Sequence, residues 1–150
     1  MNDASDPDRF QQVQSMLGAM PFYAALQVRI TKVVEGSVTL EAPLTPAFEA
    51  PPGAFAASSV GALGDMAAMT SITSALPEGQ TVSTLDFTVK MLGLSRGTAL
   101  RAVGRALQLG RTTCVGAADV FLLDGDTAIP CGTVLATGRV LNLATIHGTT

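Results

Sequence analysis

The sequence predicts one α+β domain in which a five- or six-stranded antiparallel sheet wraps around one long helix. Three observations support this class. The chain of 150 residues suits a single domain with a real core. One long stretch, Phe55–Leu76, consists almost entirely of small and apolar residues, and the chain after it alternates as a run of strands. An order of helix, two strands, long helix and three or four strands fits a sheet layered on one helix.

The N-terminal part, residues 1–24, predicts a helical extension to this domain. Its helix is expected over Pro7–Ala19, because apolar residues recur there at helical spacing, at Phe10, Val13, Met16 and Leu17. Asp6 can cap this helix, and Pro7 fits its first turn. Met20-Pro21 is expected to end it.

Two strands, Leu26–Val34 and Ser37–Pro43, follow around a turn at Glu35-Gly36. A loop with three prolines, Leu44–Gly53, leads into the Phe55–Leu76 helix. The Gly and Ala content of that helix is poor for an exposed helix, but it suits one that a sheet contacts closely.

The remaining strands are joined by turn signals. In Ser83–Met91, apolar residues alternate with Thr, Asp and Lys. The strands Thr98–Leu109, Arg111–Leu123 and Thr127–Leu143 follow, and Asp124-Gly125 predicts a hairpin between the last two. The final residues, 142–150, form a polar tail.

Composition limits the possible partners. Apolar residues make up 47% of the chain and charged residues 14%, which predicts a large buried interface and therefore a homodimer or homotetramer. The net charge is −3, and the nine basic residues form neither a nucleic-acid footprint nor a membrane-binding cluster. The acidic start, Met1–Asp8, is unlike a signal peptide, and Asp65 argues against membrane insertion of the apolar stretch, so we expect a cytoplasmic protein.

Several kinds of chemistry lack the residues that they need. Cys114 and Cys131 have no metal-ligand spacing and are expected to be free, buried thiols. The sole histidine, His147, lies in the polar tail, which disfavours Ser-His-Asp, Cys-His and zinc sites. No glycine-rich phosphate loop is present. We therefore expect no metal and no cofactor.

Asp65 is the only charged residue between Glu49 and Glu78, in the middle of the most apolar stretch. An ionised carboxylate out of water needs hydrogen-bond donors or raises its pKa. Such carboxylates are frequent at catalytic sites as bases or nucleophiles. The alternative is that the Asp65 side chain points to solvent at an edge of the domain or caps a neighbouring segment.

The start of the same helix, Ala54–Ser59, offers unpaired backbone N–H groups with partial positive charge. These groups could hold the developing oxyanion of a thioester or ester carbonyl. Asp65 lies about two turns further along, too far from Ala57 to share one reacting carbon within one subunit. The two parts could meet only if a second subunit packs its helix antiparallel nearby.

Five short segments together form a pattern of moderate specificity. They are Gly53, Leu63-Gly64-Asp65, Thr84–Leu92, Gly110-Arg111 and Cys131–Gly138. In their order and spacing the chain resembles the hotdog-fold acyl-CoA thioesterases of the phenylacetate-degradation (PaaI-like) branch. The resemblance covers about residues 27–141, and it implies a hotdog fold and an acyl-CoA thioester substrate.

The resemblance also implies roles for single residues. Asp65 would be the general base or nucleophile against the thioester carbonyl, and the backbone N–H of Ala57 would polarise that carbonyl. The hydroxyl of Thr84 would help to place water, or Asp65 from the partner subunit. Lys90 and Arg111, together with Arg96, would be candidates for the CoA phosphates, with a solvated surface role as the alternative.

The chain departs from the family pattern at the loop and at the helix start. The family's His-Gly-Gly is Ala56-Ala57-Ser58 here, and its loop Asn is Ala50. The backbone donor survives these changes, because any residue other than proline supplies an N–H. The orienting polar side chains and a glycine that lets a bulky ligand approach are lost.

Three functions remain open on this evidence. The first is hydrolysis of an acyl-CoA-type thioester. The second is a non-catalytic hotdog protein that binds an acyl, CoA-like or aromatic ligand or serves as an oligomeric partner, which the missing His and Asn favour. The third, a dehydratase or hydratase, needs a histidine at the site, and His147 would have to fold back from the tail.

Overall fold

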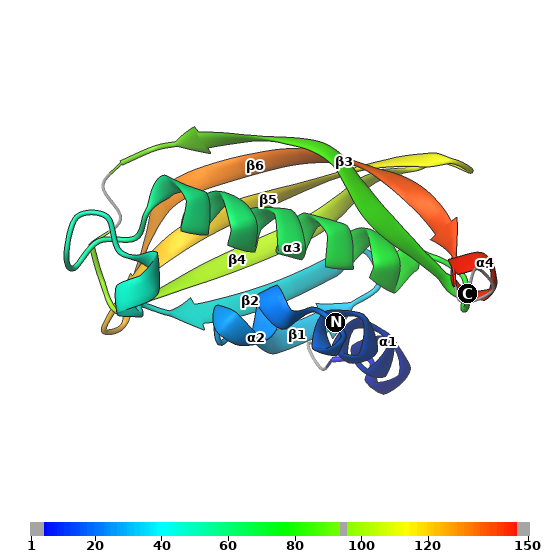
Figure 1. Cartoon of the computed structure of the whole chain (residues 1–150), viewed down its shortest axis with the longest axis horizontal. Coiled ribbons are helices and arrows are strands. Elements are labelled where there is room, and N and C mark those ends of the chain that lie inside the picture. The colour runs from blue at the N-terminus through cyan, green and yellow to red at the C-terminus, as the bar shows by residue number, and fades with distance from the viewer. Residues whose placement is uncertain (1–4, 94–95, 147–150) are drawn as a thin grey trace.

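The structure is a computed structural model that describes residues 5–93 and 96–146. Six antiparallel strands form one sheet in the order β1-β2-β4-β5-β6-β3, and α3 lies along it (Figure 1). The strands are β1 Arg29–Val34, β2 Ser37–Pro43, β3 Gln80–Met91, β4 Ala99–Leu109, β5 Thr113–Asp124 and β6 Thr127–Asn142. The helices are α1 Pro7–Gly18, α2 Pro21–Ala25, the 3-10 turn η1 Pro46–Phe48, α3 Ala57–Ala75 and α4 Leu143–Ile146. The predicted α+β architecture is confirmed, with six strands.

The N-terminal segment agrees with the prediction except at one junction. The carboxylate of Asp6 accepts from the N–H groups of Asp8 and Arg9, so it caps α1 as expected. The next strand was predicted from Leu26 but begins at Arg29. The reason is the short helix α2, because Leu26 caps its end and Gln27 then takes a left-handed backbone with φ of 52°.

The helix α3 is held very close to the sheet. A Cβ atom built on Gly104 of β4 would lie 2.0 Å from the carbonyl oxygen of Ala67, and one on Gly116 of β5 would lie 2.9 Å from that of Ala68. The hydroxyl of Ser71, also on this face, accepts from the N–H of Val38 in β2 at 3.0 Å. The small residues of Phe55–Leu76 are therefore explained by backbone-to-backbone contact, as the sequence indicated.

The two edges of the sheet differ in their cover. The edge strand β1 is joined to the chain around α1, where the N–H of Asp6 donates to the carbonyl oxygen of Val33. The other edge strand, β3, pairs only with β6 within the described part of the chain. Its side chains Leu85, Phe87 and Met91 are 60%, 45% and 39% exposed, respectively. The β3 edge is therefore both unpaired and apolar.

A β-bulge in β3 changes which side chains face α3. Thr84 pairs with Gly138 of β6, but the next pair is Asp86 with Thr137, so Leu85 is the extra residue. The sequence pattern had placed Thr84 on the face opposite to Phe87 and Val89. The bulge instead brings Thr84 to the side that faces α3, because a bulge reverses the alternation beyond it.

Other expectations are confirmed in detail. Gly125 has a positive φ of 58°, as the predicted hairpin between β5 and β6 requires. Cys114 and Cys131 are both buried thiols. The described part of the C-terminal tail contains α4, which was not predicted, while His147 lies outside the described residues. No helix among the described residues is long and apolar enough to cross a membrane.

Candidate active site

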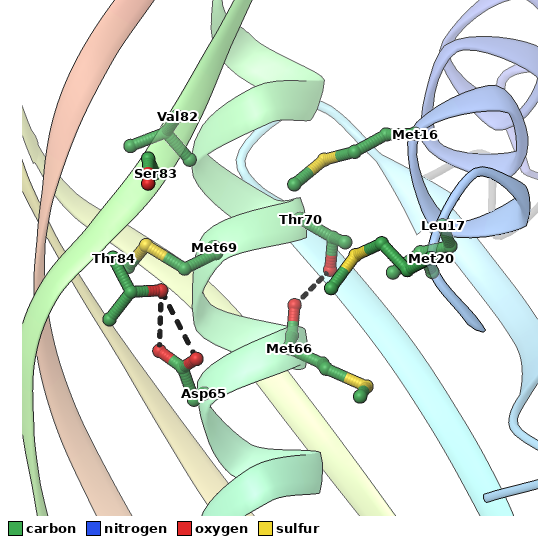
Figure 2. Close-up of a pocket in the computed structure, with 10 residues that line it drawn as sticks. All are labelled: Met16, Leu17, Met20, Asp65, Met66, Met69, Thr70, Val82, Ser83 and Thr84. Atoms are coloured by element: carbon green, nitrogen blue, oxygen red, sulfur yellow. Dashed lines mark hydrogen bonds between the residues drawn. The ribbon is translucent and has the colours of Figure 1, made fainter. Parts of the chain in front are cut away.

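The carboxylate of Asp65 and the hydroxyl of Thr84 meet between α3 and β3. The Thr84 Oγ1 donor lies 3.1 Å from each carboxylate oxygen of Asp65, as the dashed lines in Figure 2 show. This contact exists because the bulge at Leu85 turns Thr84 towards α3. The resemblance had suggested a contact between subunits, whereas this one lies within a single chain.

Burial gives the Asp65 carboxyl unusual acid–base properties. Loss of solvent raises the pKa of Asp65 above the ordinary value of 3.8, and the hydrogen bond from Thr84 opposes this shift in part. Asp65 is half-buried, and among the described residues no cation forms an ion pair with it. A carboxylate in such a place is a stronger base than a hydrated one and still reaches water.

Asp65 and Thr84 lie in the wall of a cavity of about 250 Å³. Its floor is the face of α3 that the sheet leaves uncovered, with β3 on one side and α1 on the other (Figure 2). Asp65 is the one charged residue among those that line it. The others are mostly apolar: Met16, Leu17, Met20, Met66, Met69, Thr70, Val82, Ser83 and Thr84. The cavity therefore offers one carboxylate in an apolar, methionine-rich setting.

The predicted donors at the start of α3 are exposed. Ala56 is the N-cap residue, and Ala57 and Ser58 are the first two helical residues, both on the surface. Their N–H groups have no acceptor within the helix, because the first turn has no preceding carbonyl. The carbonyl oxygen of Phe48 accepts from Ala56 N at 2.9 Å and fixes this end of α3. Ala57 lies roughly 12 Å from Asp65 along the helix axis, so one chain does not bring them together.

The loop before α3 holds two of the predicted binding residues. Ala50 is exposed, and its N–H donates to the carbonyl oxygen of Ala54. Gly53 has a φ of 78°, and its N–H donates to a carboxylate oxygen of Glu49 at 2.9 Å. Arg96 reaches this loop, because a Cβ on Gly53 would lie 3.8 Å from its guanidinium. A cation is therefore present beside the helix start.

The other two predicted cations lie elsewhere. Lys90 is exposed on β3, and its neighbours Val89 and Met91 take the side that faces α3. Arg111 is exposed in the turn between β4 and β5, where the carbonyl oxygen of Thr112 accepts from Val140. This turn lies at the end of the sheet where β3 begins, away from the start of α3 (Figure 1). The two side chains are therefore not part of one cluster with Asp65.

Solved structures resemble most of the chain in fold. A thioesterase family protein from Silicibacter pomeroyi superposes with a TM-score of 0.85 at 25% identity, over 89% of this chain and 98% of that one. The E. coli PaaI protein from the phenylacetic acid degradation operon gives 0.78 at 15% identity, over 89% and 94%. A Haemophilus influenzae thioesterase gives 0.76 at 23% identity, over 85% and 87%. No protein-family model matches the sequence, and no curated protein sequence matches it either.

The chain has the hotdog fold of the thioesterase superfamily. In this hotdog domain, α3 is the central helix that the sheet wraps, and Asp65 lies on the side of α3 next to the edge strand β3. The expected fold and resemblance are thus confirmed, while the identity of the catalytic residues remains a proposal.

The sequence interpretation missed the part that the N-terminal segment plays in the site. Met16 and Leu17 line the cavity from α1, and Met20 lines it from the start of α2, although this segment was treated only as an N-terminal extension. Two of these three residues are methionines. Their available signal was the number of methionines, six in the chain, because flexible thioether side chains are frequent in adaptable pockets. Among the described residues, no group of three or more His, Cys, Asp or Glu lies close enough to hold a metal ion.

Proposed function

We propose that this hotdog protein hydrolyses a thioester of the acyl-CoA type in the cytoplasm, with Asp65 at the reacting centre. The observation that carries the proposal is the half-buried Asp65 carboxylate, which has a raised pKa and shares a methionine-rich cavity with the donor Thr84. The likeness in fold to thioesterases supports the reaction class. The cavity supports an apolar acyl group as the part of the substrate next to Asp65.

The chemistry follows from the position of the carboxylate. As a general base, Asp65 removes a proton from water while the water oxygen bonds to the thioester carbon. The carbonyl electron pair moves to oxygen, and the tetrahedral intermediate then expels the thiolate, which takes the proton back from Asp65. In the nucleophilic form, a carboxylate oxygen of Asp65 attacks the thioester carbon, and the C–S bond breaks to release the thiolate and leave a mixed anhydride. Water then hydrolyses this anhydride, which restores the Asp65 carboxylate, releases the acid and supplies the proton that the thiolate takes up. Thr84 holds the carboxylate in place in both forms.

The oxyanion donor in this proposal is the N–H of Ala57 from a second copy of the chain. Asp65 and Ala57 are two turns apart on α3, so a second α3 that runs antiparallel would bring one of each together twice. The exposed apolar side chains on the edge strand β3, including Leu85 and Phe87, support a homodimer or homotetramer that covers this edge.

The substrate-binding residues in this proposal surround the helix start. Ala50, Gly53, Ala56 and Ser58 would line the approach of the thioester to the Ala57 donor. Lys90 and Arg111 would meet CoA phosphates from the surface.

A second candidate is a hotdog protein that binds such a ligand without hydrolysing it. The specific observation in its favour is the helix start Ala56-Ala57-Ser58, which has no histidine to orient the substrate, with Ala50 in the loop. Loss of one orienting donor commonly costs about 10²–10³ in rate. Binding without turnover would then be the function that remains.

The test is hydrolysis of short, long and aromatic acyl-CoAs by the wild type and by Asp65→Asn. The substitution keeps the shape of the site and removes the base, so we expect kcat/KM to fall by about 10²–10⁴. Asp86→Asn is the matched control, because Asp86 is an exposed carboxylate on the same strand as Thr84, and it should keep the wild-type rate. Absence of turnover with every ester, or turnover that ignores Asp65, would favour the binding protein.

A further inference from the structure

Two hollows of different size and charge meet at Met16. The first is the cavity of about 250 Å³ that contains Asp65. The second is an open groove of about 920 Å³ between α1, the C-terminal end of α3, the start of β3 and α4. Met16 is the one residue that lines both. The two hollows are therefore neighbours along α1, with this side chain between them.

Between Asp65 and Met16 the lining of the cavity is mostly apolar. Met20, Met66 and Met69 supply its thioether walls, and Val82 supplies a further apolar contact from β3. Figure 2 shows Met16 at the opposite end of the cavity from Asp65. An acyl group whose carbonyl carbon lies at Asp65 would therefore extend along α3 towards Met16.

The groove beyond Met16 differs from the cavity in size and in charge. The charged residues Asp8, Arg9 and Glu78 line it, together with apolar side chains such as Ile146. Asp65 is the one charged residue that lines the cavity. An acyl chain that passed Met16 would therefore leave a small, mostly apolar space for a wide, open and charged one.

The backbone at Met16 is held in place by the anchoring of α1. The guanidinium of Arg9 donates to the carbonyl oxygen of Ser74 at the end of α3 and pairs with Glu35 at 2.6 Å. Val13 and Leu17, on either side of Met16 along the helix, are fully buried. The helix therefore has a fixed position over α3, while the unbranched Met16 side chain is the adjustable part of the boundary.

We propose that Met16 sets the length limit of the acyl group that this protein accepts. The occupant is a compact apolar acyl group, straight-chain or aromatic, that fills the cavity between Asp65 and Met16. Its small size follows from the cavity volume of about 250 Å³, which is below the usual range for sites of drug-sized ligands. This inference rests on the proposed function for the position of the thioester carbon, and it adds the substrate class and the residue that selects it.

The test measures binding, so that it does not depend on turnover. Straight-chain acyl-CoAs of increasing length are titrated calorimetrically into Asp65→Asn, which keeps the cavity but lacks the base. We expect the affinity to rise with length up to a limit and then to fall. Met16→Ala on this background should move the limit to longer chains and raise the affinity for a chain with two more methylenes about tenfold.

Met20→Ala on the same background is the matched control. It removes the same atoms from the same cavity, but Met20 does not line the groove. This variant should therefore widen the cavity for bulkier acyl groups without moving the limit on chain length. Met16→Phe should move the limit to shorter chains, which gives a second reading if the alanine variant folds poorly. An unchanged limit in both Met16 variants, or an affinity that ignores chain length, would overturn the inference.

Failure of the inference and failure of the proposed function give different results. A length limit that follows Met16 in a protein whose wild type hydrolyses no thioester would keep the acyl site and remove the enzyme. Hydrolysis that depends on Asp65 with a limit that ignores Met16 would keep the enzyme and remove this role of Met16.

Discussion

The two faces of α3 differ in how closely other parts of the chain pack against them. The sheet-facing side carries Gly64, Ala67, Ala68 and Ser71, and it lies so close to β4 and β5 that glycines are needed on the strands. The other side carries Asp65, with Met66, Met69 and Thr70, and borders a cavity. Both sides are apolar for the most part, so hydropathy alone does not tell them apart.

The comparison shows how one helix can serve both fold and site. Contacts through backbone atoms have no rotamers to adjust, so the sheet-facing side fixes the position of α3 closely. The methionine side chains on the other side can change rotamer around a ligand at small cost. A rigid support on one side thus allows a half-buried carboxylate and an adaptable cavity on the other.

The largest effect is expected for Gly104→Ala, which tests how closely β4 packs on the sheet-facing side of α3. The new Cβ would lie 2.0 Å from the carbonyl oxygen of Ala67 and 2.4 Å from the hydroxyl oxygen of Ser71, and the first of these is a backbone atom. Gly104 pairs with strands on both sides, with Val38 and with Ala118, so β4 has little room to shift. We expect a loss of about 1–3 kcal/mol or more in the free energy of unfolding, measured by urea titration.

Gly18→Ala provides the matched control for this substitution. A Cβ at Gly18 meets nothing within 4 Å, and the residue is the last of α1. Since alanine is the better helix former, this variant should match or exceed the wild type by up to about 1 kcal/mol. Equal stability of Gly104→Ala and the wild type would contradict the comparison, because the space between β4 and α3 would then accept an extra methyl group.

The sequence predicted the tight side better than the open one. The small residues of Phe55–Leu76 and the alternation of the later strands are local patterns, and they sufficed for the helix inside an antiparallel sheet. The lone Asp65 was also visible, because a charge in an apolar run is a local feature. Its partner Thr84 was expected near it only through the family resemblance.

The remaining features depend on contacts between distant segments. The bulge at Leu85 decides that Thr84 faces α3, and strand alternation without a bulge predicts the opposite face for it. Met16 of α1 and Met20, which caps the start of α2, belong to the site because this N-terminal segment packs over α3. Such packing leaves no signature in the sequence of α1 beyond an amphipathic pattern that any surface helix shows.

A smaller effect is expected for Thr84→Val, which tests the hydrogen bond from Thr84 to Asp65 on the cavity-facing side of α3. The substitution keeps the shape of the side chain and removes the donor to both Asp65 carboxylate oxygens. Because that hydrogen bond lowers the pKa of Asp65, its loss raises the pKa further. The acidic limb of the pH profile of kcat/KM should move to higher pH, and the rate above the limb should fall roughly tenfold as the carboxylate loses its anchor.

Thr88→Val is the control for that experiment. Thr88 is an exposed threonine of the same strand and pairs with Leu135 on β6. The pH profile of this variant should match the wild type. A limb that moves equally in both variants would indicate a general effect of β3 on the site and would remove Thr84 as a positioning residue.

The smallest effect concerns protein stability, which is lowered by burial of the ionised Asp65 carboxylate on the cavity-facing side of α3. The pKa of its carboxyl is raised in the folded protein and is close to 3.8 in the unfolded chain, so between these two values the folded state binds more protons. Stability therefore falls as the pH rises through that window, and the deficit is fully present above the folded pKa. Asp65→Asn should raise the melting temperature at neutral pH, and this gain should shrink as the pH is lowered towards the ordinary aspartate value.

Asp86→Asn, measured in parallel on the exposed side of β3, separates this effect from a change in net charge. A gain that is equal at all pH values, or the same in both variants, would mean that the Asp65 carboxylate carries no desolvation cost and that the open side of α3 is as wet as the surface.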